Sequence, residues 1–103
     1  MPLSLPHFPE GWCCYLLLCE DGSYYCGLTG DLRHRLLDHA SGKGSKYTRG
    51  TKPTALVWFE HYSSRELAAR REREIKTWGR KKKDLLAKGG VRVSLVRQEA
   101  DSG

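Results

Sequence analysis

The sequence predicts an α+β domain in which a small, three-stranded antiparallel sheet is flanked by helices. Three observations support this fold class. The apolar run WCCYLLLC at 12–19 has the length of a buried strand and is followed by a Glu-Asp-Gly turn. The segment 54–62 is rich in β-branched and aromatic residues, which is typical of a third strand. Amphipathic segments with capping residues at their starts separate and follow these strands, and they predict helices.

The expected order along the chain is strand, strand, helix, strand, helix, helix. Asp31 is a good N-cap for the first helix, Ser63 or Ser64 for the second, and Gly79 separates the second from the third. Residues 12–88 then form one domain. A lead-in is expected at 1–11, and the two hairpin strands at 12–19 and 23–28. The first helix is expected at 31–40, a basic loop at 41–53 and the third strand at 54–62. Two further helices are expected at 64–78 and 80–88, followed by an edge strand or tail at 89–103.

The register of the hairpin decides whether Tyr15 and Tyr25 lie together. A two-residue loop places the two phenols on opposite faces of the sheet. A three-residue loop at 20–22, with Gly22 in the left-handed conformation, places them on the same face. A glycine in the last loop position favours the second register. Gly27 then lies opposite Tyr15 and is expected to leave room there for a substrate.

The positive charge of the chain is concentrated in one segment. The chain holds 18 basic and 12 acidic residues, a formal charge of +6. Residues 65–83 contain nine bases and three acids, and this excess of six bases equals the formal charge of the whole chain. Residues 43–52 add four bases without an acid. Such patches are typical of binding to nucleic acid, although a single charge run is more often a solvated helix face. Charge alone does not choose DNA over RNA or an anionic membrane surface.

The cysteines and the N-terminus predict a cytoplasmic location. The four cysteines lie in one hydrophobic stretch without a C-x-x-C motif, so reduced, buried thiols are expected rather than a zinc site. No apolar run approaches the ~20 residues that cross a bilayer, and 1–10 lack the features of a signal peptide. No membrane partner is therefore expected.

Four helical side chains are candidates for chemistry on a phosphate. Arg35 and His39 are four residues apart and share a helix face, and a guanidinium matches phosphate oxygens. Glu72 and Glu74 flank the apolar stripe of the long helix, and a carboxylate there could hold a divalent metal. Helical periodicity does not choose between these two glutamates. Surface ion pairs are the plain alternative for all four side chains.

These residues together resemble the GIY-YIG nuclease superfamily, especially its small stand-alone branch. The resemblance covers about residues 12–88 and rests on C-C-Y-x9-Y-C-G, on T-G-D-L-x-x-R-L-x-x-H and on a later helical glutamate. The segments G-K-G-S-K-Y-T-R-G and R-R-E-R-E-I-K-T-W also match that branch. Cys13-Cys14-Tyr15 stands in place of Gly-Ile-Tyr, and Cys26 replaces the middle residue of the second motif. Both tyrosines and Gly27 are retained.

The resemblance implies a metal-dependent endonuclease that hydrolyses phosphodiester bonds in DNA, structure-selective and connected with repair or recombination. It implies one divalent ion, Mg²⁺ or Mn²⁺, on Glu72 rather than Glu74. A tyrosine would orient or deprotonate the attacking water, and Arg35 would neutralise charge on the phosphate. The implied catalytic residues are Tyr15, Tyr25, Arg35, His39 and Glu72, and the implied substrate-binding residues are Gly27, Thr29, Lys46, Tyr47, Thr48 and Arg49.

Two alternatives to an endonuclease stay open. The first is a nucleic-acid-binding module that keeps the fold without catalysis, and the presence of all five catalytic positions favours the enzyme over it. The second is a basic protein whose patches contact another protein or a membrane. The length leaves no room for an added DNA-reading domain, so a partner protein or a homodimer is the expected source of specificity.

Overall fold

The computed structural model describes residues 4–44 and 50–96 and shows an α+β fold built on one antiparallel sheet. The sheet has four strands in the order β2-β1-β3-β4. The predicted class and element order are confirmed, and the predicted edge-strand segment adds a short fourth strand to the three expected. The described elements are β1 (Cys13–Cys19), β2 (Tyr24–Thr29), α1 (Leu32–Ala40), β3 (Pro53–His61), α3 (Arg65–Lys76), α4 (Arg80–Lys88) and β4 (Val93–Ser94).

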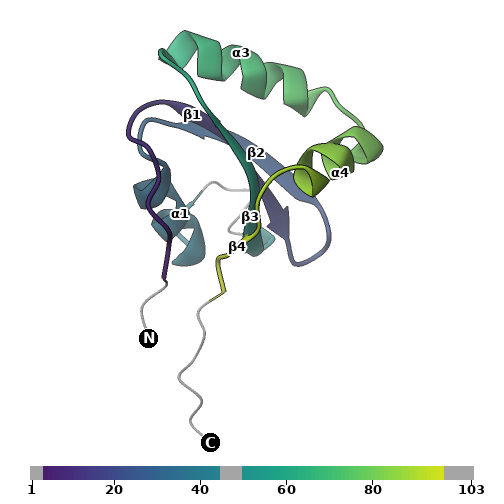
Figure 1. Cartoon of the computed structure of the whole chain (residues 1–103). Coiled ribbons are helices and arrows are strands. Elements are labelled where there is room, and N and C mark those ends of the chain that lie inside the picture. Colours follow the sequence, from purple (N-terminus) through teal and green to yellow (C-terminus); the bar gives the residue numbers. More distant parts are fainter. Residues whose placement is uncertain (1–3, 45–49, 97–103) are drawn as a thin grey trace, which may run out of the picture.

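β1 lies between β2 and β3, which explains why its sequence is apolar throughout. Consecutive side chains of a strand point to opposite faces, and Cys13 and Cys14 accordingly belong to two different core clusters. Helix α1 covers one face, whereas α3 and α4 cover the other (Figure 1). We call these the α1 face and the α3 face. None of the helices at 4–44 and 50–96 is long and apolar enough to cross a membrane.

The two clusters supply the apolar surface that holds the helices on the sheet. On the α1 face, Leu32 and Leu36 of α1 pack against β1 and β3. On the α3 face, Ile75 of α3 packs against Cys14 and Leu16 of β1. Fully burying a side chain of this size stabilises the fold by about 1.5–3 kcal/mol. Helices α1 and α3 are therefore held in position, and so are the polar side chains that they carry next to the sheet.

The hairpin has the three-residue loop that Gly22 favours. Gly22 has a φ of +85° and donates its N–H to the Cys19 carbonyl, and the Cys19 N–H donates to the Ser23 carbonyl at 2.8 Å. This register pairs Tyr15 with Gly27 and Leu17 with Tyr25. Both phenols consequently lie on the α1 face, as the second register predicts.

The predicted helix caps are also present. The Asp31 carboxylate accepts a hydrogen bond from the His34 N–H at 3.1 Å, and α1 begins directly after Asp31. The Ser64 hydroxyl accepts one from the Leu67 N–H, so Ser64 rather than Ser63 caps α3. These bonds satisfy donors that have no partner within the helix.

A bulge in β3 was not predicted. Leu16 pairs with Trp58 while Leu17 pairs with Leu56, so Val57 is the extra residue. The bulge puts both Val57 and Trp58 on the α3 face. The Val57 carbonyl then accepts a hydrogen bond from the Val91 N–H at 2.8 Å, which attaches the chain that follows α4 to the sheet.

Gly27 is required by Tyr15, which corrects the expectation that its missing side chain leaves room for a substrate. A Cβ at this position would lie 2.6 Å from Cζ and Oη of Tyr15 and 3.0 Å from Cε2 of Tyr25. The Tyr15 ring itself therefore occupies the space beside Gly27. The glycine allows the two aromatic side chains to pack against the backbone of β2.

The Gly27→Ala substitution is expected to destabilise the fold by about 1–3 kcal/mol, because the new methyl group must displace the buried Tyr15 ring. Gly30→Ala is the matched control, since a Cβ there would meet Trp12 at 3.6 Å, an ordinary contact. Urea unfolding of both variants measures the difference. Equal stability of the two variants would contradict this packing.

Candidate active site

Three aromatic side chains form a cluster on the α1 face. Tyr15 comes from β1, Tyr25 from β2 and His39 from the last turn of α1. The ring centroids are 6.3 Å apart for the two tyrosines, 5.7 Å for Tyr15 and His39, and 5.3 Å for Tyr25 and His39. A hydrogen bond of 2.8 Å joins Oη of Tyr15 to Nε2 of His39. Arg35 lies one turn before His39 on the same side of α1, and the pair thus shares a face as predicted.

The cluster has a buried inner layer and an accessible outer layer. Tyr15 and His39 are each only 1% exposed. Tyr25 and Arg35 are half-buried, so parts of both side chains reach the surface. A ligand can therefore contact Tyr25 and Arg35 directly, whereas Tyr15 and His39 are closed to it.

Burial keeps both inner side chains neutral. Burial raises the pKa of Tyr15 well above its ordinary value and Tyr25 raises it further, while contact with the Arg35 guanidinium lowers it only in part. Burial also lowers the pKa of His39 to about 4, and the charge of Arg35 acts in the same direction. At neutral pH the pair is thus a phenol and an uncharged imidazole. Tyr15 is unsuited to be the base that deprotonates water.

The direction of the Tyr15–His39 hydrogen bond follows from Arg35. The positive charge of the nearby Arg35 guanidinium, which can only donate, disfavours a phenolic proton directed toward it. The phenolic proton is then directed at Nε2 of His39, which accepts it. A neutral imidazole that accepts at Nε2 carries its proton on Nδ1. The structure thus favours an arrangement in which Tyr15 donates to His39 and the Arg35 charge lies on the side of the Tyr15 oxygen.

Glu72 lies on α3, against the opposite face of the sheet from this cluster. Its side chain is 17% exposed, its charge acts on the buried thiols of Cys14 and Cys26, and its carboxylate lies 3.4 Å from the Lys76 ammonium. Glu74, by contrast, is 54% exposed and forms an ion pair with Arg71. The structure therefore distinguishes the two glutamates that helical periodicity could not separate.

The exposed edge of β2 relates Glu72 to the aromatic cluster. β2 is the outer strand of the sheet, so the α1 face and the α3 face adjoin along it (Figure 1). Tyr25 and Cys26 are consecutive residues of β2 and point to opposite faces. Tyr25 hence lies on one side of this outer strand, and Glu72, whose charge acts on Cys26, lies on the other side.

Other residues expected in a substrate cleft have local roles or lie outside the described residues. The Thr29 hydroxyl accepts a hydrogen bond from the Asp31 N–H at 3.1 Å, so Thr29 helps to order the turn that precedes α1. Residues Lys46, Tyr47, Thr48 and Arg49 lie outside the described residues.

Several bases of the segment 65–83 have structural partners that the charge count did not reveal. The Arg71 guanidinium stacks between Trp58 and Trp78, at 5.6 and 5.2 Å from their ring centroids. Arg80 lies over the Tyr24 ring, whose hydroxyl donates to Asp84 at 2.6 Å. The spacing of helical ion pairs such as Arg71–Glu74 and Arg80–Asp84 could be read from the sequence. The contact of Arg71 with Trp58 and Trp78 depends on the packing of α3 on the sheet.

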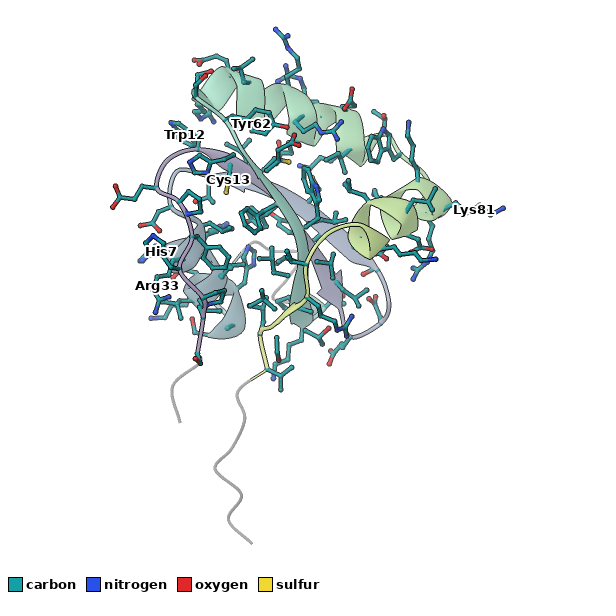
Figure 2. All side chains as sticks on the ribbon, viewed as in Figure 1. His7, Trp12, Cys13, Arg33, Tyr62 and Lys81 are labelled. Atoms are coloured by element: carbon teal, nitrogen blue, oxygen red, sulfur yellow. The ribbon has the colours of Figure 1, made fainter. Side chains whose placement is uncertain are left out.

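Other bases of the same segment are available to a ligand. Figure 2 shows the Lys81 side chain extending from α4 into solvent. Arg70 and Arg73 are exposed on α3, and Lys82 is exposed on α4 beside Trp78, with its ammonium 4.4 Å from the ring centroid. The positive surface for a polyanion is therefore smaller than the charge count predicts.

The carboxylate of Glu72 fits a divalent ion only as part of a larger set of ligands. Within residues 4–44 and 50–96, no group of three or more His, Cys, Asp or Glu side chains is arranged to hold a metal. Mg²⁺ is commonly bound by one or two carboxylates together with water and substrate phosphates. Glu72 suits such a site, completed by the substrate, once the Lys76 ammonium moves away.

Comparison with known proteins places this geometry in context. Residues 11–84 match the GIY-YIG catalytic domain. A UPF0213 protein of Bacillus pumilus (strain SAFR-032) is 51% identical over 71 residues, which cover 69% of this chain and 72% of that protein. A UPF0213 protein of Haloquadratum walsbyi is 44% identical over 80 residues, with coverages of 78% and 90%. The solution NMR structure of a UPF0213 protein from Bacillus halodurans has a TM-score of 0.49 and 47% identity, covering 75% of this chain and 82% of that one.

Stability is expected to fall in acid because His39 is buried uncharged. Its pKa of about 4 in the folded protein lies below the ordinary 6.5, so the unfolded chain binds the extra proton. The free energy of unfolding should therefore decrease by about 3 kcal/mol as the pH falls from 6.5 to 4. The His39→Gln variant, which keeps an acceptor for Tyr15, should lack this component in urea unfolding.

His34→Gln is the control, because His34 is exposed on the same helix. It should retain the pH dependence of the wild-type chain. An identical acid dependence for His39→Gln and the wild type would show that His39 is not buried as a neutral ring.

Proposed function

Because this chain belongs to the GIY-YIG family, we propose that it is a metal-dependent endonuclease that hydrolyses phosphodiester bonds in DNA. A GIY-YIG catalytic domain implies a nuclease-type function, and the relatives named above carry only the family name UPF0213. The observation that carries the proposal is that Tyr25 and Arg35 lie together on the α1 face while Glu72 lies on the α3 face near Cys26 of the outer strand β2.

Arg35 and Tyr25 are the two groups that would touch the reacting phosphate. A half-buried guanidinium holds its charge without full hydration, so it stabilises the extra negative charge that develops as water attacks phosphorus. Tyr25 is the less buried tyrosine of the pair, and its hydroxyl would orient the attacking water. Tyr15 and His39 are positioning residues, since their hydrogen bond holds the rings against which Tyr25 and Arg35 pack.

Glu72 is the residue that would hold one Mg²⁺ or Mn²⁺. Such an ion, when bound, acts as a Lewis acid on a phosphate oxygen. The side chain is partly buried and points toward the sheet, so its carboxylate has a defined position. Lys76 neutralises that carboxylate in the absence of substrate.

DNA would be bound mainly through its backbone phosphates. The exposed bases of α3 and α4 are suited to phosphate contacts, which carry no sequence information. Selectivity among DNA substrates would then come from the structure of the DNA, such as a branch or nick formed in repair or recombination. A partner protein or a second copy of the chain is the other possible source. RNA is the second candidate substrate. The proposal also places the protein in the cytoplasm.

Cleavage of labelled single-stranded, nicked, branched and duplex DNA with Mg²⁺ or Mn²⁺ tests the proposal. Cleavage should stop when the metal is chelated. Arg35→Ala and Glu72→Gln should each lower the rate by about 10²–10³-fold, because each removes a charge that acts on the reacting phosphate. Glu74→Gln is the matched control, since Glu74 is exposed and paired with Arg71, and it should leave the rate unchanged.

Binding to the same DNA measures whether these variants keep the substrate interface. The proposal expects Glu72→Gln to bind DNA at least as tightly as the wild type while failing to cleave it. Tight binding by the wild-type chain without cleavage of any substrate in either metal would favour the non-catalytic binding module instead.

A further inference from the structure

Two buried thiols lie next to each other on the α3 face. The Sγ atoms of Cys14 on β1 and Cys26 on β2 are 3.7 Å apart. Both cysteines are free, and their side chains are 0% and 5% exposed, respectively. Neither thiol takes part in the proposed cleavage reaction, so the proximity has no explanation in that function.

The strand register brings the two thiols close enough for a disulfide bond once the strands also shift slightly. Tyr15 pairs with Gly27, so Cys14 and Cys26 are diagonal neighbours on the same face of adjacent strands. A disulfide bond has an S–S distance of about 2.05 Å, so the two sulfur atoms must approach by about 1.7 Å. Rotation of the two Cys side chains and a small change in strand twist can supply this movement.

The other two cysteines are poorly placed to compete. Cys13 belongs to the core of the α1 face, on the opposite side of the sheet. Cys19 is five residues beyond Cys14 on β1, a distance of about 16 Å along a strand. A disulfide formed within the folded chain should therefore join Cys14 to Cys26 selectively.

We propose that Cys14 and Cys26 form a peroxide-reactive dithiol that is oxidised to an intramolecular disulfide. Cys26 lies on the edge strand and is the more exposed of the two thiols, so it reacts first with hydrogen peroxide. Its sulfur bonds to one peroxide oxygen as the O–O bond breaks, which gives a sulfenic acid and one water molecule. The Cys14 sulfur then attacks the Cys26 sulfur, and the sulfenic oxygen leaves as a second water molecule.

The atoms and electrons of this reaction balance. Two thiols and one hydrogen peroxide give one disulfide and two water molecules, the two sulfur atoms losing the two electrons that the peroxide oxygens gain. The new bond joins β1 to β2, the strands that carry Tyr15 and Tyr25, beneath Glu72 of α3. Oxidation would thereby lock the hairpin in its present register.

Peptide mass spectrometry of the full chain, before and after treatment with hydrogen peroxide, tests the proposal. The treated chain should lose about 2 Da, the mass of two hydrogen atoms, and yield one cross-linked peptide pair containing Cys14 and Cys26. After denaturation, only Cys13 and Cys19 should react with iodoacetamide, and dithiothreitol should restore all four reactive thiols.

Three variants identify the role of each thiol. Cys13→Ala is the matched control and should still form the disulfide, because it removes a buried thiol from the other face. Cys14→Ala should accumulate a sulfenic acid at Cys26 that dimedone traps, since the second thiol is missing. Cys26→Ala should leave Cys14 reduced at the same peroxide concentration.

The proposal is overturned if peroxide leaves four reactive thiols, or if the bond forms to Cys13 or Cys19. It is equally overturned if Cys26 proceeds to sulfinic acid in the wild-type chain without forming a disulfide. These readouts do not depend on DNA cleavage, so their failure would leave the proposed nuclease function untouched.

Discussion

The hydrogen bond between Tyr15 and His39 is the interaction on which the geometry of the candidate site depends. It joins β1 to α1 inside the α1 face, where an unsatisfied polar group would cost about 1–3 kcal/mol. Two features of the fold make it possible. Gly27 leaves the backbone of β2 without a Cβ where the Tyr15 ring lies, and Leu32 and Leu36 hold α1 against the sheet.

This buried bond separates side chains closed to solvent from those that a ligand can reach. Tyr15 and His39 are held neutral and out of contact with solvent, so their protons are committed to each other and to the fold. Tyr25 packs against both rings of this layer, and Arg35 lies beside the two tyrosines. Glu72 lies on the other face of the sheet, on α3, where its charge acts on Cys26 of the outer strand β2.

Local signals in the sequence predicted the elements that local physics determines. Gly22 in the last loop position indicated the hairpin register, and Asp31 indicated the start of α1. Features that depend on distant contacts were missed. The bulge at Val57 is stabilised by the chain after α4, and Arg71 finds Trp58 and Trp78 only when α3 lies on the sheet.

The candidate site was predicted unevenly for the same reason. The spacing of Arg35 and His39 showed that they share a helix face, but not that His39 would be buried against Tyr15. Glu72 and Glu74 both border an apolar stripe, and only the packing of α3 shows which one is partly buried. Gly27 was interpreted as room for a substrate because a sequence does not reveal which side chain fills a gap.

The protonation state of the His39 ring at neutral pH tests this account most directly. Long-range ¹H–¹⁵N NMR spectra of the imidazole distinguish its two neutral forms from the cation. We expect a neutral ring with the proton on Nδ1 and an unprotonated Nε2 that accepts from Tyr15. A proton on Nε2 would contradict it, since the ring would then donate to Tyr15 and leave the phenolic proton free for another partner.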